Sequence, residues 1–357
     1  MKKIMFYINA IHNGGAERVM VNLSKYFSLN NYDTVLVTSF RDTWEYSLSA
    51  DVKRITLEEE EIKQSRIKRN ISRIKKLRQV CKDEKPDILI SFMEEPNFRA
   101  IIATRGLSIK TLVSVRNDPY KEYAGKVGKI VGKIILPMAD GCVFQTSEAK
   151  EWFPKKLQNK SKIIYNAVKE EFYQIDRKPN RGEIVTCGRL EEQKNHANLI
   201  NAFSEIIKDY PYTSLKIYGE GSLKKELQKQ IDSLGLEKKA FLMGQTNDVA
   251  NVLQTADLFV LSSNYEGMPN ALMEAMAAGV SCISTDCPCG GPRELLKEIE
   301  DKALVPVDDV SALAEKIKDY MGTVGEQNFK MKMIAEKFKP DIINEQWKKY
   351  VDELIQE

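Results

Sequence analysis

The sequence predicts two α/β domains, each built on a parallel sheet with helices on both faces. The chain has 357 residues, which exceeds the length at which a single core usually keeps growing. Short apolar runs rich in β-branched residues also alternate with segments of helical length along the whole chain. This alternation is typical of parallel sheets, because crossover helices join parallel strands and cover both faces.

The expected strands form two series that a polar, turn-rich stretch separates. The first series is "IMFYINA" (4–10), "TVLVTSF" (34–40), "DILISFM" (87–93), "TLVSV" (111–115) and "GCVFQT" (141–146). The second begins after residue 160 with "SKIIYNA", "EIVTCGRL", "SLKIYGEG", "AFLMG", "DLFVLSS" and "SCISTD". Pro179 and Gly182 mark the boundary, so we expect domains at 1–165 and 166–340. Residues 341–357 are expected to form an amphipathic helix that docks on either domain.

Composition excludes several classes of protein. Hydrophobic residues make up 43% of the chain, and no apolar run approaches the roughly 20 residues that span a bilayer. The opening "MKKIMFYINAIHNGG" lacks the small-residue cleavage site of a signal peptide. Six scattered cysteines, of which only Cys287 and Cys289 are close-set, are expected to be free thiols. These features favour a cytoplasmic protein.

The charge is divided unequally between the two halves. Residues 1–165 contain 30 Lys and Arg against 19 Asp and Glu, whereas the remainder contains 24 against 32. A basic amino-terminal half indicates an anionic surface or substrate on that side.

The stretch "LSSNYEGMPNALMEAMAAG" (261–279) contains the first candidate site. Its strand leads into a turn and then into an alanine-rich helix that Gly279 stops. A helix that starts at the carboxyl end of a parallel strand presents free N–H groups and a positive dipole end to an anion. The residues expected to border the ligand are Gly267, Met268, Pro269, Asn270, Ala271 and Leu272, the last three through their amides.

Two glutamates in this stretch are candidates for contact with hydroxyl groups. Glu274, one turn into the helix, is placed to accept hydrogen bonds from a ribose, and Glu266 is placed to face the group being transformed. The alternative is structural, with Glu274 on a solvated helix face and Glu266 merely preceding a turn.

Two glycine-containing turns supply further candidates in the second half. In "GRLEEQKNH", Gly188 ends a strand and the cations Arg189 and Lys194 follow, a pair able to clamp a diphosphate. The alternative is two unrelated surface cations. In "YGEGSLKKELQ", Gly219, Glu220 and Gly221 form a strand-to-helix turn suited to close backbone approach to a ligand.

In the first half, Gly14 and Gly15 join the first strand to an amphipathic helix, either for close approach to a bound group or as a plain tight turn. The two histidines, His12 and His196, lack partner ligands at metal spacing, and there is no D-x-D motif. A bound metal is not expected.

Together these fragments resemble the retaining family-4 glycosyltransferases of GT-B fold. The resemblance rests on Gly14-Gly15 with "AER", on "GRL" followed by Lys194, on "GEG" and on "EGMPNALMEAMAAG", in order over nearly the whole chain. It implies two Rossmann-like domains facing across a cleft, with a nucleotide-sugar donor held mainly by the second and an acceptor mainly by the first. It also implies a last helix that crosses back to the first domain.

The resemblance assigns roles to individual residues. Arg189 and Lys194 would clamp the diphosphate and stabilise the leaving nucleoside diphosphate. Glu274 would bind the ribose, and Glu266 would lie near the donor sugar. Because cations and amides would meet the charge on the leaving group, no divalent ion is required. Retention of anomeric configuration would follow the family.

The amino-terminal half departs from the family at one position. Gly14 and Gly15 would border the diphosphate and the acceptor, as in the family. Many members carry a donor-contacting histidine after the strand equivalent to "TLVSV", where this chain has Arg116 and Asn117. Arginine cannot act as a base at neutral pH. Either Arg116 takes over as a sugar or phosphate contact, or the donor sugar differs.

Residues 63–82 carry nine Lys and Arg and no acid. Apolar residues at helical spacing (Ile67, Ile71, Ile74, Leu77 and Cys81) are expected to pack inward and leave a broad cationic face. That face would bind an anionic membrane or a pyrophosphate-linked lipid carrier. Lysines 121, 126, 129 and 133 add to it, and the absence of interleaved aromatic residues in 63–82 disfavours nucleic acid. The expected membrane or acceptor residues include Lys63, Arg66, Lys68, Arg69, Arg73, Lys75, Lys76 and Arg78.

The leading hypothesis is a glycosyltransferase that moves a sugar from a UDP-linked donor to a lipid-linked glycan at the inner face of the plasma membrane. This would be a step in capsule, O-antigen or related polysaccharide synthesis. The first alternative is a nucleotide-sugar epimerase of similar architecture, which needs no acceptor. The second is a non-catalytic nucleotide-sugar or lipid-binding module.

Overall fold

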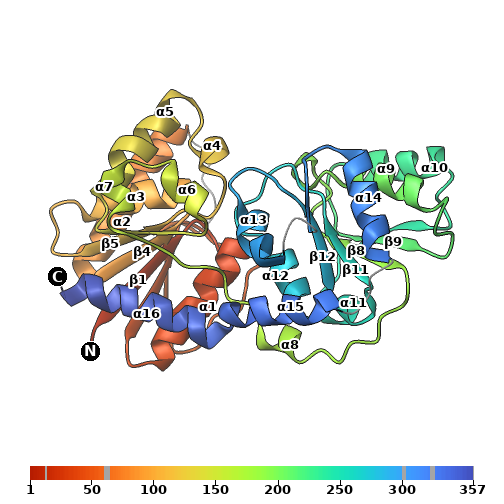
Figure 1. The fold of residues 1–357 in the computed structure, drawn as a ribbon. Coiled ribbons are helices and arrows are strands. Elements are labelled where there is room, and N and C mark those ends of the chain that lie inside the picture. Colours follow the sequence, from red (N-terminus) through yellow and green to blue (C-terminus); the bar gives the residue numbers. More distant parts are fainter. Residues whose placement is uncertain (13, 60–64, 300–302, 322–325, 357) are drawn as a thin grey trace. The chain divides into compact units, whose positions relative to one another are not determined.

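A computed structural model describes residues 1–12, 14–59, 65–299, 303–321 and 326–356 (Figure 1). The chain divides into two compact units. The amino-terminal unit comprises residues 1–166 and 341–357, and the carboxy-terminal unit comprises residues 167–340. Each unit has its own parallel sheet, so the predicted α/β class with two Rossmann-like domains is confirmed.

The amino-terminal unit contains a seven-stranded sheet in which all the paired strands run parallel. Its strands in spatial order are β3 (Lys53–Thr56), β2 (Asp33–Thr38), β1 (Lys3–Ile8), β4 (Ile88–Phe92), β5 (Lys110–Ser114), β6 (Gly141–Phe144) and β7 (Ser161–Ile163). Its helices are α1 (Gly15–Leu29), α2 (Arg66–Glu84), α3 (Glu94–Thr104), α4 (Pro119–Glu122), α5 (Gly125–Ile130), the π-helix η1 (Val131–Ile135), η2 (Leu136–Met138), α6 (Ser147–Glu151), α7 (Lys155–Gln158) and α16 (Pro340–Gln356).

The carboxy-terminal unit contains a six-stranded parallel sheet. Its strands in spatial order are β10 (Ala240–Gly244), β9 (Ser214–Tyr218), β8 (Glu183–Cys187), β11 (Leu258–Leu261), β12 (Ser281–Thr285) and β13 (Leu304–Val305). Its helices are α8 (Glu170–Tyr173), η3 (Glu192–Lys194), α9 (His196–Ile206), α10 (Lys224–Ser233), α11 (Val249–Thr255), α12 (Asn270–Ala277), α13 (Gly291–Leu296), η4 (Lys297–Ile299), α14 (Val310–Met321), α15 (Glu326–Ala335) and η5 (Glu336–Phe338).

The strand order of each sheet reverses next to its first strand. In the amino-terminal unit the reversal lies between β1 and β4, and in the carboxy-terminal unit it lies between β8 and β11. Loops diverge at such a point, and open parallel sheets bind ligands there, outside the carboxyl ends of the strands. The topology therefore selects the loops after β8 and β11 as one candidate site and the loops after β1 and β4 as a second.

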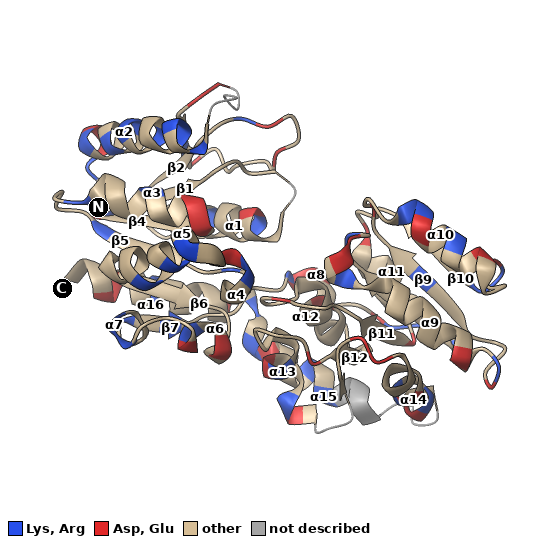
Figure 2. Cartoon of the chain, turned by 90° about the horizontal axis from the view of Figure 1, so that it is seen from above, with Lys and Arg blue, Asp and Glu red and all other residues tan. Residues whose placement is uncertain are grey.

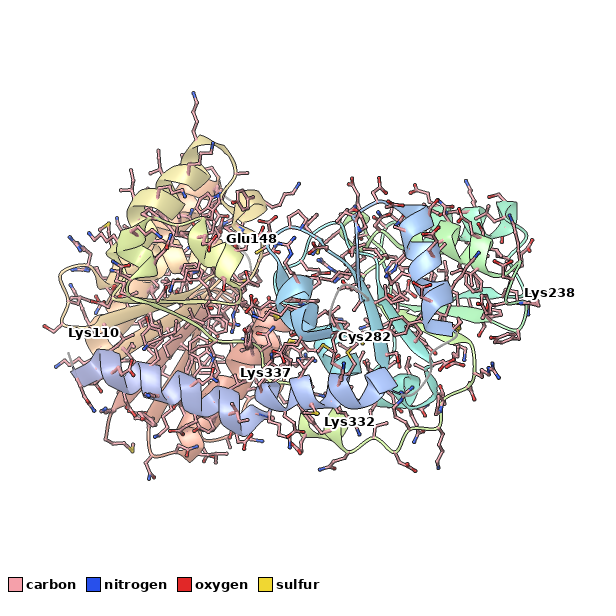
Figure 3. The ribbon with its side chains drawn as sticks, viewed as in Figure 1. Lys110, Glu148, Lys238, Cys282, Lys332 and Lys337 are labelled. Atoms are coloured by element: carbon pink, nitrogen blue, oxygen red, sulfur yellow. The ribbon has the colours of Figure 1, made fainter. Side chains whose placement is uncertain are left out.

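Successive residues of the central strands are buried, so both faces of each sheet are covered; Figure 3 draws the side chains. Apolar strand residues such as Ile184, Val260 and Ile283 are fully buried in the carboxy-terminal unit. Cys282, labelled in Figure 3, is buried on β12, and burial raises the pKa of its thiol. The described cysteines are all free thiols.

One strand belongs to a different sheet from the one we expected. The sequence predicts that "SKIIYNA" opens the second series, but its strand, β7, pairs with β6 and closes the first sheet. The polar stretch that marks the domain boundary starts only after this strand, which explains the error. No described helix has the length and apolarity to cross a membrane.

The predicted inward stripe of α2 is wrong at its start. Ile67 and Ile71 are 73% and 51% exposed, and only Leu77 and Cys81 of the predicted stripe are fully buried. Burial raises the pKa of the Cys81 thiol to about 12. The first turns of α2 therefore extend beyond the sheet that its second half covers.

The predicted cationic face of α2 is also narrower than we expected, although Figure 2 shows basic residues along the helix. Arg73 does not belong to this face, because it is 1% exposed and donates from Nε and Nη2 to Glu58 Oε2 at 2.9 and 2.8 Å. Arg66 pairs with Glu95 at 2.7 Å. Lys68 and Lys75 are exposed, and Lys63 lies outside the described residues.

Three further cations of α2 are also partly engaged. Lys76 lies 3.5 Å from Glu58 Oε1, and Arg78 donates to the carbonyls of Ala103 and Arg105 at 2.7 Å. Arg69 is half-buried. The sequence could not reveal these pairings because the partners lie on other elements.

Candidate active site

The loops after β8 and β11 are tied together by hydrogen bonds in the carboxy-terminal unit. Ser262 Oγ donates to the Lys194 carbonyl at 3.0 Å, and the Asn264 amide donates to the Gln193 carbonyl at 2.8 Å. Asn195 Nδ2 donates to Asn264 Oδ1 at 2.9 Å. These bonds fix the two loops against each other at the point where the strand order reverses.

An ion pair between Lys194 and Glu266 lies at the centre of these loops. Lys194 Nζ donates to Glu266 Oε1, and the side chains are only 16% and 8% exposed. Ser263 Oγ donates to the same carboxylate oxygen at 2.7 Å. Charged groups in such a sheltered place interact more strongly than in water, so this pair holds both side chains in fixed positions. Glu266 therefore does more than precede a turn.

Arg189 is exposed and linked to the pair through Gln193. Arg189 Nη2 donates to Gln193 Oε1 at 3.1 Å, and Gln193 Nε2 donates to the Tyr265 carbonyl at 3.0 Å. The cation that the sequence predicts beside Lys194 thus lies at the same sheet edge, with its side chain open to solvent. Its geometry suits an anionic ligand that arrives from outside.

The glycines of this region are required by close backbone contacts. A Cβ at Gly219, whose φ is +151°, would collide with the Gly188 carbonyl, and a Cβ at Gly221 would collide with the Leu190 carbonyl. A Cβ at Gly188 would lie 3.2 Å from the Lys194 side chain. The "GEG" turn therefore packs directly on the "GRL" turn, and the exposed Glu220 accepts a hydrogen bond from Lys224 at 2.7 Å.

The helix α12 starts at the predicted place. Pro269 is its N-cap, Met268 is buried, and the amides of Asn270, Ala271 and Leu272 occupy the first turn, before the Met273 amide donates to the Pro269 carbonyl. The carbonyl of Gly267 packs so tightly on Gly291 that no larger residue fits at 291. The turn thus presents amides and a dipole end beside Glu266.

Glu274 is not on a solvated face. Its exposure is 6%, and it lies close enough to Cys187, at the end of β8, to help burial raise the pKa of that thiol to about 12. Both glutamates are thus buried against the two loops. This disagrees with the alternatives in which Glu274 lies on a solvated helix face and Glu266 merely precedes a turn. A buried carboxylate at the end of β8 is suited to accept hydrogen bonds from hydroxyl groups.

His196 begins α9 directly behind the loop that carries Lys194. It is 3% exposed and lies beside the backbone of Gly188 and Arg189. Burial, and secondarily the nearby Lys194, lowers the pKa of His196 to about 4. The imidazole is therefore neutral at pH 7 and supports the loop without adding charge to it.

Acid is expected to destabilise the protein through His196. In the unfolded chain its pKa is about 6.5, so the unfolded state binds the proton more readily than the folded state between pH 6.5 and 4. Over that window, the free energy of unfolding should fall by roughly 2–3 kcal/mol as the pH drops. His196→Leu should remove this contribution, as measured by urea denaturation at pH 7 and 4.5. Equal pH dependence in both proteins would contradict this assignment.

The amino-terminal unit places Gly14 and Gly15 at the start of α1, after β1. Gly14 is the N-cap, and a Cβ there would collide with the Glu17 carboxylate. Glu17 is 8% exposed and lies 3.3 Å from His12 Nε2. This close contact explains the first glycine of the pair, and it puts both glycines at the reversal point of the first sheet.

Arg116 follows β5 and is 9% exposed. Its Nη1 donates to Asn166 Oδ1 at 2.9 Å, and its guanidinium lies 4.0 Å from the Phe92 ring centroid and 5.7 Å from that of Trp347. Within the described residues Nε and Nη2 have no hydrogen-bond partner. Burial lowers the pKa of Arg116 to about 9, so it remains charged at pH 7. The neighbouring Asn117 is half-buried.

The residues that connect the two loops of the site were not predicted from the sequence. Gln193, Asn195 and Asn264 bind across loops some 70 positions apart, whereas Ser263 binds Glu266 within its own loop, and no local pattern marks them. Their position is the one signal in the sequence: Ser263 ends a predicted strand, Asn264 follows it, and Gln193 and Asn195 adjoin Lys194. In the described part of the chain, no three His, Cys, Asp or Glu residues gather as they would around a metal ion.

The two parallel sheets and the loops at their reversal points define a protein of the GT-B fold. Solved structures of this fold match nearly the whole chain. The lipopolysaccharide outer core galactosyltransferase WaaB superposes with a TM-score of 0.79 at 20% identity over 99% of both chains. Anabaena HepE, solved with UDP and glucose, superposes with a TM-score of 0.80 at 17% identity over 99% of this chain and all of its own. At these identities the likeness establishes the fold alone.

Two family models identify the chain. "Glycosyltransferase Family 4" matches residues 13–172, and "Glycosyl transferases group 1" matches residues 168–337. The chain belongs to the family-4 glycosyltransferases and is a glycosyltransferase, as the sequence motifs predict.

Individual relatives extend this match. An uncharacterised glycosyltransferase of Methanocaldococcus jannaschii is 32% identical over 63% of this chain and 62% of its own. A Campylobacter jejuni alpha-1,4-N-acetyl-D-galactosaminyltransferase is 26% identical over 99% of both chains. An Escherichia coli alpha-1,3-galactosyltransferase is 28% identical over 74% of this chain and 77% of its own. These relatives are transferases and give no support to the epimerase alternative.

Proposed function

We propose that this protein transfers a sugar from a UDP-sugar to a glycan on a lipid diphosphate carrier, with retention of anomeric configuration, in the synthesis of a bacterial surface polysaccharide such as an O-antigen or capsule. Two of the relatives support the acceptor class. The Campylobacter enzyme is named for a substrate linked to PP-undecaprenol, and the E. coli enzyme for UDP-Gal and a diphosphoundecaprenol acceptor. The UDP-Gal donor of the E. coli enzyme also supports the choice of base.

The observation that carries this proposal is the Lys194–Glu266 pair beside the first turn of α12. A nucleotide-sugar donor breaks its bond between the anomeric carbon and the diphosphate oxygen, so negative charge grows on that oxygen. We propose that Lys194, Arg189 and the amides of 270–272 meet this charge. Cations and N–H groups that are already in place before the reaction stabilise such charge without further reorganisation.

The glutamates would orient the two ends of the donor. We propose that Glu274 accepts hydrogen bonds from the ribose and that Glu266 keeps Lys194 in position while it borders the donor sugar. Glycines 188, 219, 221 and 267 would let the backbone approach the ligand closely. The amino-terminal unit would supply the acceptor site, with Gly14 and Gly15 at its sheet edge, and Asn117 would be a further contact to the donor.

Charge neutralisation by side chains and amides makes a metal unnecessary, so we propose a metal-independent reaction. Transfer should proceed at an unchanged rate after dialysis against EDTA. A loss of turnover that Mg²⁺ or Mn²⁺ restores would contradict this part of the proposal.

The direct test is a panel of nucleotide sugars incubated with the protein and bacterial lipid extract, with products identified by mass spectrometry. We expect one donor, UDP-linked, to extend a lipid-linked glycan by one sugar. The donor incubated alone should stay unchanged, because an epimer formed without acceptor would favour the isomerase. Donor binding without product from any acceptor would favour a non-catalytic module.

Arg116 offers a test of whether the amino-terminal unit contributes to the reaction. A buried guanidinium without a counter-ion adds little stability, so Arg116→Met should change the free energy of unfolding by less than about 1 kcal/mol. If Arg116 contacts the donor sugar or a phosphate, the same variant should lower kcat/KM at least about tenfold. Unchanged turnover would mean that Arg116 does not contact the donor. It would favour a donor sugar that differs from those of the family members with a histidine at this position.

A further inference from the structure

The segment 125–135, formed by α5 and the π-helix η1, exposes an unusual number of apolar side chains. Val127, Ile130 and Ile134 are 72%, 52% and 60% exposed, and they are spaced three and four positions apart. This spacing puts them in one row along the outer side of the helix. We call this row and its neighbouring lysines the α5 ridge.

A row of lysines runs beside the apolar row. Lys126, Lys129 and Lys133 are exposed, and each directly precedes one residue of the apolar row in the sequence. Figure 2 shows basic residues on α5. No acid occurs between residues 123 and 139. Among the described residues no carboxylate lies within ion-pair distance of these lysines, and Lys133 Nζ lies 3.8 Å from the Trp152 ring centroid. The charges of the ridge are thus available, unlike several on α2.

The inner side of the same helix explains why the aliphatic residues point outward. Gly128 and Gly132 face the unit, where a Cβ would lie 2.6 Å from the Tyr123 backbone and 2.5 Å from the Trp152 ring. Tyr123 and Trp152 stack at 5.7 Å between ring centroids. The helix therefore sits on aromatic side chains through its glycines. A helix that merely covered the sheet would turn its isoleucines inward.

We infer that the α5 ridge docks on the surface of an anionic lipid bilayer. Its apolar row would enter the boundary between headgroups and acyl chains, and its lysines would lie against anionic headgroups. The single sign of the charge favours anionic lipid over a second copy of the chain, because two such ridges would repel each other. This inference rests on the proposed function only in that a lipid-linked acceptor lies at a membrane.

The test is co-sedimentation of the full chain with vesicles of phosphatidylglycerol and phosphatidylcholine, compared with vesicles of phosphatidylcholine alone. We expect binding to the anionic vesicles that weakens with salt. The triple variant Val127→Ser, Ile130→Ser, Ile134→Ser should lower the partition coefficient at least about tenfold. The triple variant Lys126→Gln, Lys129→Gln, Lys133→Gln should lower it about a hundredfold at low salt.

Matched controls replace residues of equal character elsewhere. Leu29→Ser, Leu234→Ser, Met333→Ser removes three exposed apolar side chains that are 62%, 40% and 60% exposed. Lys225→Gln, Lys229→Gln, Lys238→Gln removes three exposed lysines of the carboxy-terminal unit, of which Lys238 is labelled in Figure 3. Both controls should bind vesicles like the natural protein.

Three outcomes would overturn the inference. They are no binding of the natural protein to anionic vesicles, equal binding by the ridge variants, or a dimer that the apolar variant dissociates while vesicle binding persists. The result is separable from that of the proposed function, because vesicle binding needs no donor. Transfer to a short water-soluble acceptor should survive the ridge variants if the catalytic proposal is correct.

Discussion

Lys194→Met is expected to lower kcat/KM for sugar transfer at least about a hundredfold. The variant removes the ammonium that we propose to neutralise the leaving diphosphate, and it also leaves the carboxylate of Glu266 nearly buried, with the Ser263 hydroxyl as its remaining hydrogen-bond donor among the side chains that the structure describes. Initial rates with the donor found in the screen measure the effect. Lys229→Met, which removes an exposed lysine of α10, serves as the control and should retain full activity.

A second variant separates chemistry from folding. An unpaired carboxylate in this sheltered position destabilises the protein, so Lys194→Met should also lower the thermal midpoint. Adding Glu266→Gln should recover most of the lost stability, because a neutral amide needs no counter-ion, but it should not restore turnover. Recovery of activity in the double variant would mean that the pair is a structural brace and not a part of the site.

Arg73→Met is expected to lower the stability of the amino-terminal unit by about 3–5 kcal/mol. Arg73 and Glu58 have side chains only 1% and 2% exposed, and the guanidinium also lies 5.3 Å from the Phe40 ring centroid. Removing the cation leaves a buried carboxylate whose remaining cation within the described part of the chain is the partly exposed Lys76, 3.5 Å away. Native-state hydrogen exchange of the α2 amides reports the loss for this unit alone.

The matched control for Arg73 lies on the same helix. Lys75 is exposed, and Lys75→Met should change the exchange free energy by no more than about 0.5 kcal/mol. Arg73→Met combined with Glu58→Leu should recover much of the stability, since two apolar side chains replace a buried pair. A small effect of Arg73→Met alone would show that the pair is not coupled as the structure indicates.

The sequence was most informative where the signal is local. Apolar runs and glycine turns predicted the two parallel sheets and the start of α12 at Asn270. Such elements are predictable because the periodicity of apolar residues in a strand or a helix appears within a short stretch of sequence. Short strands such as β3 and β13 carry too few residues for such a pattern, and they were missed. The strand β7 was given to the second series because a strand's sheet depends on its neighbours in space.

Side-chain partners were the least predictable part. The position of Glu266 in a turn was visible in the sequence, but its contact with Lys194, 72 positions away, depends on the strand order of the sheet. For the same reason Arg73 was taken for a surface cation, although Glu58 holds it inside. In α5 and η1, glycines and aliphatic residues alternate so closely that the side that faces outward is shown by the packing of Gly128 on Tyr123 and of Gly132 on Trp152.

The most direct measurement is a crystal structure of the protein with UDP bound. We expect the diphosphate against Lys194, Arg189 and the amides of residues 270–272, and the ribose hydroxyls within hydrogen-bond distance of Glu274. A nucleotide bound elsewhere, with no phosphate near Lys194, Arg189 or the start of α12, would contradict the proposed site.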